Sequence, residues 1–174
     1  WEETFAALRD ISAKEAQRHK ELQSSEKCDG YSRKVYERLV NGSATEVELS
    51  SALLDLSAML HSHYDVAPVI IIDEYDTPIQ QGHSEDYYDK IIRFMRNLFS
   101  GGFKDNSHLS FGFLTGILRV AKESIFSGMN NLSINSVLDN KYSAYFGFTA
   151  DEVREMAAYY DAADKYDEIC PVSY

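Results

Sequence analysis

Residues 69–72 form a run of four β-branched side chains, which Asp73, Glu74 and Asp76 follow almost directly. A strand that is apolar on both faces is typical of a central parallel strand with helices on each side. In open sheets of this kind, ligands bind in the crevice at the carboxyl ends of the strands. The sequence therefore predicts a buried strand that delivers three carboxylates to a candidate site.

Size and composition limit what the chain can be. The 174 residues, 44% of them hydrophobic, suit one domain with its own core. No apolar run approaches the roughly 20 residues that span a bilayer, so we expect no membrane segment. The chain begins at Trp1 without an initiator methionine or a visible signal peptide, so we expect a fragment of a longer protein. The two cysteines form no CxxC pair, which favours a cytoplasmic location over a disulfide framework or a zinc ribbon.

The chain is strongly acidic. Seventeen basic against 28 acidic residues leave a net charge of −11. A surface of this charge repels phosphate backbones, so direct nucleic-acid binding by this segment is not expected. The acidity alone identifies no partner and leaves the oligomeric state open.

Residues 1–66 are predicted to be helical. Thr45 and Glu48 form a capping box for one helix, which places leucines from Leu49 to Leu60 on a core-facing side. Residues 67–122 are predicted to hold the acidic strand and a second buried strand over 109–115.

A polar loop with Pro78 and Gly82 is expected after the first strand, and then a helix over 85–99. Gly101 and Gly102 are predicted to end that helix. Residues 123–174 are predicted to be mainly helical, with one helix capped at Thr149. The order of helices, strand, helix, strand and helix is typical of half a doubly wound α/β sheet within one incomplete domain.

Four blocks in this order resemble the predicted AAA-ATPase-like family, which occurs widely in bacteria and often carries a PD-(D/E)XK nuclease-like domain. They are Asp73-Glu74-Tyr75-Asp76-Thr77-Pro78-Ile79, Leu114-Thr115-Gly116-Ile117-Leu118-Arg119-Val120-Ala121-Lys122, Ser124-Ile125-Phe126-Ser127-Gly128-Met129-Asn130-Asn131-Leu132, and Phe146-Gly147-Phe148-Thr149 before Glu152-Val153. The blocks cover residues 69–153, and the helical residues 1–68 fit more loosely.

The resemblance implies part of a P-loop NTPase core of the ASCE/RecA-like type, with Mg²⁺ and ATP as ligands. Asp73 matches the magnesium-associated Walker B acid, and Glu74 matches the acid that polarises the attacking water. Thr115 holds the place of the polar sensor of the γ-phosphate. Arg119 and Lys122 would bring positive charge to a phosphate. Asp76 is a further candidate for cofactor binding.

The family's P-loop is missing from these residues, because none of the nine glycines is followed by lysine. The resemblance implies that the P-loop would precede Trp1. The chain also departs from the family's pattern at residues 166–174. We therefore expect an ATP-hydrolysing switch for an attached effector in the full-length protein, while this fragment alone would be inactive.

The sequence supports three alternatives to the NTPase interpretation to different degrees. A non-catalytic interaction module on a degenerate NTPase scaffold is the principal one. A metal-dependent nuclease site built from Asp73, Glu74 and Asp76 is weaker, because the net charge of −11 opposes DNA binding. A haloacid-dehalogenase-type site would need a second aspartate where Tyr75 stands, so it is set aside.

Overall fold

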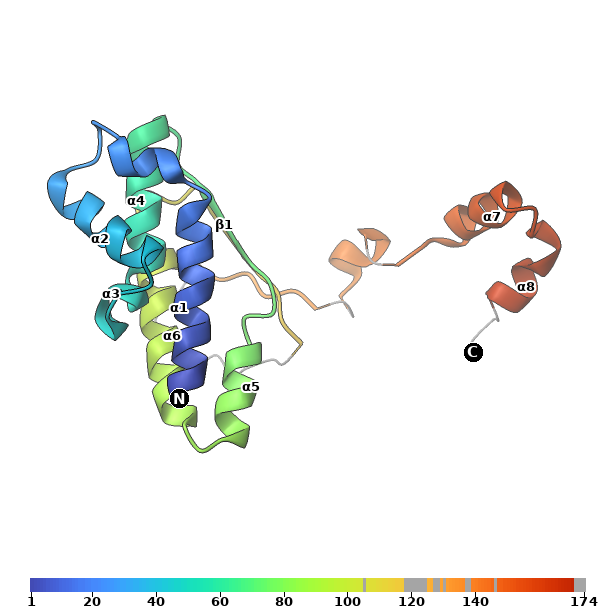
Figure 1. Cartoon of the computed structure of the whole chain (residues 1–174). Coiled ribbons are helices and arrows are strands. Elements are labelled where there is room, and N and C mark those ends of the chain that lie inside the picture. The colour runs from blue at the N-terminus through green and yellow to red at the C-terminus, as the bar shows by residue number, and fades with distance from the viewer. Residues whose placement is uncertain are drawn as a thin grey trace. The chain divides into compact units, whose positions relative to one another are not determined.

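The structure is a computed structural model of the chain (Figure 1). It describes residues 1–104, 106–117, 125, 126, 129, 131–136, 139–145 and 147–170. The chain forms two compact units, Trp1–Asn131 and Leu132–Tyr174, and each is described by itself. The sequence-based assignment of one incomplete domain stays a prediction.

The N-terminal part of the first unit is helical, as the sequence predicts. Its elements are α1 (Glu2–Gln17), the 3₁₀ helix η1 (Lys20–Ser24), α2 (Gly30–Val40), α3 (Glu46–Ser50) and α4 (Ala52–Tyr64). The predicted capping box is present: the Thr45 hydroxyl accepts from the Glu48 N–H at 3.3 Å, and the Glu48 carboxylate accepts from the Thr45 N–H at 2.9 Å. The one long helix expected after Thr45 is instead two, α3 and α4, which meet at Ser51.

These helices share a core that polar groups help to hold in register. Leu22, Leu39 and Leu49 are almost completely buried. The buried Tyr36 hydroxyl donates to the carbonyl oxygens of Ala16 and His19, each at 3.0 Å. Ala16 lies in the last turn of α1 and His19 lies just before η1, so this hydroxyl ties α2 to the junction between α1 and η1. The helical layer is therefore a packed support for the elements that follow.

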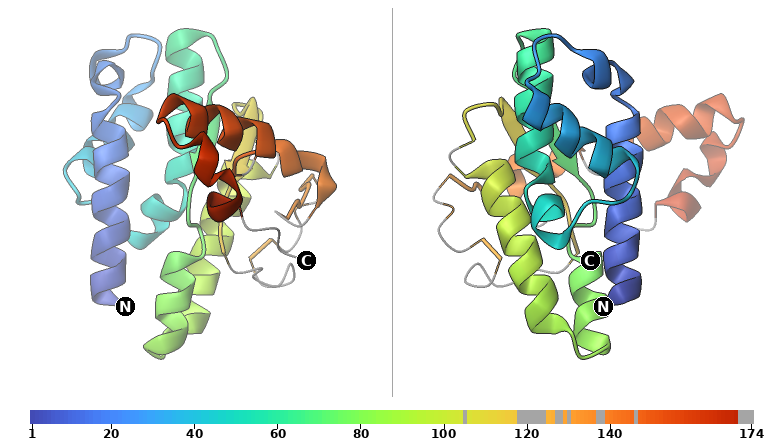
Figure 2. Two further views of the ribbon diagram at one scale, coloured as in Figure 1. Left: turned by 90° about the vertical axis from the view of Figure 1, so that its right-hand side faces the viewer. Right: turned by 60° about the vertical axis from the view of Figure 1, so that its left-hand side comes forward.

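A β–α–α–β segment completes the described fold of the first unit. Strand β1 (Val69–Ile72) leads into α5 (Thr77–Ser84) and α6 (Tyr88–Phe103), and β2 (Phe111–Leu114) pairs with β1 in parallel. The register sets Val69 opposite Phe111 and Ile72 opposite Leu114. Helices α4 and α6 pack on each other beside the sheet (Figures 1 and 2). Among the described residues the sheet has these two strands, and both end at the same edge.

Helix α5 corrects the prediction of a polar loop. Pro78 lies in the first turn of the helix, where its missing N–H is no loss. Ile79 is buried, and Gly82 lets α6 approach, since a Cβ at Gly82 would lie 2.6 Å from Ile91 Cγ2. Proline and glycine are typical turn residues in a sequence. Here Pro78 lies at the start of a helix, and Gly82 lies where two helices are in contact.

The expected end of α6 at Gly101 and Gly102 is also wrong, because the helix continues to Phe103. Gly102 faces α4, and a Cβ there would lie 2.9 Å from Leu53 Cβ. The glycine therefore permits close packing of two helices. Tertiary contact outweighs the modest helix-breaking tendency of glycine.

The described residues cover the sheet mainly on one face, whereas the sequence predicts two buried faces. On the covered face, the Phe103 ring of α6 lies so close to Gly112 that a Cβ there would be 2.5 Å from it. On the other face Val69, Ile71, Phe111 and Phe113 are 50–71% exposed. The predicted second strand is present, but its phenylalanines lie on the exposed side.

The second unit contains short helices: η2 (Asn140–Tyr145), α7 (Ala150–Tyr159), η3 (Ala163–Lys165) and α8 (Tyr166–Ile169). The predicted capping box of Thr149 and Glu152 is present at the start of α7. Several aromatic residues of this unit are exposed, among them Tyr145 at 82% and Phe148 at 71%. Phe146 lies outside the described residues.

The fold is thus mostly helical α/β with a small parallel sheet. Within the described residues, every helix is too short or too polar to cross a bilayer. The more specific assignment to a P-loop NTPase core stays a prediction.

Candidate functional site

The ends of β1 and β2 are held together beyond the sheet. The Thr115 N–H donates to the Ile72 carbonyl at 2.9 Å, and the Tyr75 N–H donates to the Thr115 carbonyl at 3.0 Å. These two bonds continue the parallel pairing into the turn that carries the acidic residues. They place Asp73 and Thr115 next to each other at the carboxyl edge, where the sequence predicts a site.

Asp73 and Thr115 are in direct contact. The Thr115 hydroxyl donates to Asp73 Oδ1, and the same oxygen accepts from the Glu74 N–H at 3.0 Å. The Glu74 N–H also lies 3.4 Å from the Thr115 hydroxyl oxygen. Asp73 is exposed and Thr115 is half-buried, so the pair is open to a ligand from solvent.

Glu74 has an uncommon backbone conformation. Its φ of +51° lies in the left-handed region. The other non-glycine residues described with positive φ are three aspartates, a residue type that tolerates this region better than glutamate. Asp73 and Glu74 are both exposed directly after the end of β1. Strain of about 1–3 kcal/mol per residue is characteristic of functional turns.

Asp76 is 1% exposed and has its carboxylate directed inward. Its Oδ2 accepts from the Ile117 N–H at 3.1 Å and from the Gln80 side-chain amide at 3.0 Å. The carboxylate therefore joins the first turn of α5 to the segment after β2. This location suits a residue that positions Thr115, and its expected part in cofactor binding stays a prediction.

Gly116 and Tyr75 complete this junction, and sequence reasoning assigned neither a role. A Cβ at Gly116 would lie 2.7 Å from Asp76 Oδ1 and 2.8 Å from Tyr75 Cε1. The Tyr75 ring packs edge-on against Phe99 and Phe126, with ring centroids 6.1 and 5.4 Å away. In the sequence, the glycine directly after Thr115 is the signal that the segment after β2 approaches the turn after β1 closely.

Arg119 and Lys122, the predicted sources of positive charge, lie outside the described residues. Their distance from the acidic turn therefore stays a prediction. The described site brings together Asp73, Glu74 and Thr115, with Asp76 behind them.

The donors fit Mg²⁺, which prefers oxygen ligands. Magnesium is commonly held by one or two carboxylates, with waters and phosphate oxygens filling the remaining positions. The Asp73 carboxylate beside the Thr115 hydroxyl is suited to that arrangement. Among the described residues no cluster of three His, Cys, Asp or Glu side chains forms a cage for a metal.

One histidine pair was not found from sequence spacing. His61 of α4 and His108, which precedes β2, place their Nδ1 atoms 3.2 Å apart. His63 points elsewhere and contacts the Ser25 hydroxyl at 2.9 Å. The pair ties α4 to the loop before β2.

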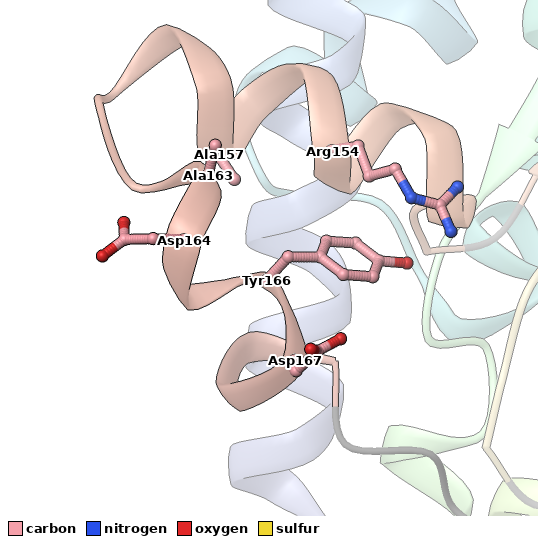
Figure 3. A pocket seen from close by; sticks show the side chains of 6 residues that line it. All are labelled: Arg154, Ala157, Ala163, Asp164, Tyr166 and Asp167. Atoms are coloured by element: carbon pink, nitrogen blue, oxygen red, sulfur yellow. The ribbon is translucent and has the colours of Figure 1, made fainter.

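The second unit has a cavity that is lined by residues of α7, η3 and α8 (Figure 3). None of the predicted site residues lines it. It has a volume of about 390 Å³, and its lining residues are Arg154, Ala157, Ala163, Asp164, Tyr166 and Asp167. The Arg154 guanidinium lies 4.7 Å from the centroid of the Tyr166 ring and pairs with Asp151 at 2.7 Å. The cationic group is thus already neutralised by its own unit.

Comparisons with known proteins identify the family of this chain. The family model described as "Predicted AAA-ATPase" matches residues 1–126. A protein from Azotobacter chroococcum mcd 1, titled "Uncharacterized protein in vnfD 5'region", is 32% identical over 120 residues. That match covers 68% of this chain and 23% of the relative, so the chain spans about a quarter of the relative's length. No solved structure matches the chain. Since the family model covers well over half of the residues, including β1, β2 and the acidic turn, the chain belongs to the predicted AAA-ATPase family.

Proposed function

We propose that this chain is the acidic-turn and sensor part of a nucleoside-triphosphatase domain that binds and hydrolyses ATP with Mg²⁺. The observation that carries the proposal is the contact between Asp73 and Thr115 at the carboxyl ends of two paired parallel strands. In P-loop NTPases, catalysis rests on positioning and on neutralising phosphate charge. A carboxylate, a second acid and a hydroxyl at one sheet edge provide groups for both tasks.

Each residue has a separate part in the proposed reaction. Asp73 holds the metal, and Glu74 orients and polarises the attacking water. Thr115 donates its hydroxyl to an oxygen of the γ-phosphate. Held by Asp73, Mg²⁺ would supply positive charge to the phosphate groups. Arg119 and Lys122 are proposed to add positive charge from the segment after β2.

The Thr115 hydroxyl carries a single proton, so it has one hydrogen bond to donate. Here it gives that bond to Asp73. Donation to a phosphate oxygen would remove this hydrogen bond from Asp73 Oδ1, which would keep its bond from the Glu74 N–H and would have a second lone pair available to donate to a metal. Nucleotide binding and metal binding are therefore coupled through one hydroxyl in this proposal.

The strongly acidic chain makes additional phosphate-binding groups necessary. With a net charge of −11, it repels a triphosphate unless cations are supplied. We propose that other parts of the full-length polypeptide supply the phosphate cradle, and that the 174 residues alone do not turn over ATP. In that polypeptide, hydrolysis would switch an attached effector, for which a nuclease-like domain is one candidate.

Calorimetric titration of the full-length polypeptide with ATP and Mg²⁺ tests the proposal. We expect saturable binding that Asp73→Asn weakens at least tenfold, because the substitution removes the metal-binding charge but little volume. Asp10→Asn is the matched control: Asp10 is an exposed aspartate on α1 that pairs with Lys14 at 2.6 Å.

Equal affinity in the wild type and in Asp73→Asn would contradict the assigned role of Asp73. A full-length polypeptide that binds no nucleotide would reject the NTPase proposal and favour the non-catalytic interaction module. DNA cleavage that depends on Asp73 would instead support a nuclease site.

A further inference from the structure

The second face of the β1–β2 sheet forms an apolar patch. Val69 and Ile71 of β1 are 54% and 71% exposed, and Phe111 and Phe113 of β2 are 61% and 50% exposed. The register pairs Val69 with Phe111 and Ile71 with Phe113. The four side chains are thus adjacent and point to the same side of the sheet, and they are called the sheet patch below.

A parallel sheet with one face that the described residues leave uncovered is unusual for a finished domain. Parallel strands are normally covered on both faces, because crossover helices lie on each side. Here α6 covers the opposite face, with Phe103 packed against Gly112. Soluble proteins seldom leave a contiguous cluster of large apolar side chains exposed unless it binds something. The sheet patch therefore requires an occupant.

We propose that the occupant is a helix from a further β–α unit of the same polypeptide, which lays an apolar side across the sheet patch. The crossover between β1 and β2 places its helices on the covered face. A doubly wound sheet sends other crossovers to the opposite face. The Azotobacter relative supports an intramolecular occupant, since only 23% of its length corresponds to this chain.

The size of the sheet patch also favours a helix over a second copy of the chain. Four side chains exposed to this extent offer on the order of 500 Å² of apolar surface. One partner in a standard protein interface contributes about 800 Å². An amphipathic helix buries a narrower stripe, which suits two pairs of cross-strand neighbours. The occupant should carry basic residues where it passes the acidic turn at Asp73 and Glu74.

Hydroxyl-radical footprinting without nucleotide tests this inference on both the 174-residue chain and the full-length polypeptide. Oxidation of Phe111 and Phe113 should fall several-fold in the longer polypeptide. Tyr31, which is 71% exposed on α2, is the internal control and should be oxidised at the same rate in both.

A matched pair of variants gives a second measurement. Ile71→Lys and Ile11→Lys each place a charge at an exposed isoleucine, the first within the sheet patch and the second on α1. In the full-length polypeptide, Ile71→Lys should lower the midpoint of thermal unfolding by several degrees and Ile11→Lys should not. In the 174-residue chain neither variant should lower the midpoint.

Equal oxidation of Phe111 and Phe113 in both polypeptides, or an unchanged midpoint for Ile71→Lys in the longer one, would overturn the proposal. Protection that appears in the 174-residue chain as it dimerises with rising concentration would assign the sheet patch to a second copy instead. These measurements use no nucleotide, so the inference can fail while the proposed NTPase function stands.

Discussion

Substitution of Gly116 by alanine tests the junction behind the candidate site. The new Cβ would lie 2.7 Å from Asp76 Oδ1 and 2.8 Å from Tyr75 Cε1. The tyrosine ring has little freedom to retreat, because it packs against Phe99 and Phe126. The carboxylate can move only by weakening its bond to the Ile117 N–H.

The size of the effect follows from these contacts. Forcing an additional carbon into a close-packed contact costs about 1–3 kcal/mol, and a hydrogen bond to a charged group contributes about 1.5–3 kcal/mol. We expect Gly116→Ala to lower the free energy of unfolding by about 2–4 kcal/mol. Because a domain is stable by only about 5–15 kcal/mol, this loss is readily measured.

Urea unfolding followed by circular dichroism provides the assay, with the midpoint compared at an unchanged slope. Gly30→Ala is the control, because a Cβ at Gly30 meets no atom within 4 Å. That variant should change the free energy of unfolding by less than about 1 kcal/mol. Equal midpoints for Gly116→Ala and Gly30→Ala would refute the close approach. In an Asp76→Ala background, the cost of Gly116→Ala should shrink, because one clashing atom is gone.

Further predictions concern α6, the acidic turn and α7. Gly101→Ala should stabilise the chain by about 0.5–1 kcal/mol, because the new Cβ has room inside a helix. Gly102→Ala should destabilise the chain, because its Cβ would clash with Leu53. The urea midpoints of the two variants should therefore lie on opposite sides of the wild-type midpoint. Glu74→Gly should have a free energy of unfolding about 0.5–1 kcal/mol higher than Glu74→Ala, because glycine adopts a φ of +51° without strain. Urea unfolding of the two variants measures this difference. The backbone N–H of Thr149 and, second, its hydroxyl lower the pKa of Glu152 from its ordinary 4.5; NMR titration should show a smaller shift in Thr149→Ala, which keeps the N–H and loses the hydroxyl. The contribution of Glu152 to stability is present above pH 4.5 and is lost as the pH falls through the lowered pKa.

Local chemistry made several features predictable from sequence. The capping boxes at Thr45 and Thr149 rest on residues three positions apart, so no tertiary information is needed to find them. The meeting of Asp73 and Thr115 follows from two strands that end at the same edge, which the β-branched run and the next apolar strand indicate.

Other features depend on packing between distant segments. The helix α5 and the extension of α6 through Gly102 pass through residues that usually mark turns. They are helical because Gly82 and Gly102 let neighbouring elements approach closely. The exposure of Phe113 could not be predicted from alternation, since a strand pattern shows which residues share a face but not what covers it. The inward direction of Asp76 likewise depends on the Ile117 N–H, 41 residues away in sequence.

The contact between Asp73 and Thr115 is the centre of this account, and a double-mutant cycle on ATP–Mg²⁺ affinity tests it most directly. The full-length polypeptide would be compared with Asp73→Asn, Thr115→Val and the double variant. If the two residues serve one site, the double variant should lose less affinity than the sum of the single losses, with a coupling of about 0.5–3 kcal/mol. Losses that add within about 0.3 kcal/mol, or single variants that bind as tightly as the wild type, would contradict a shared nucleotide site.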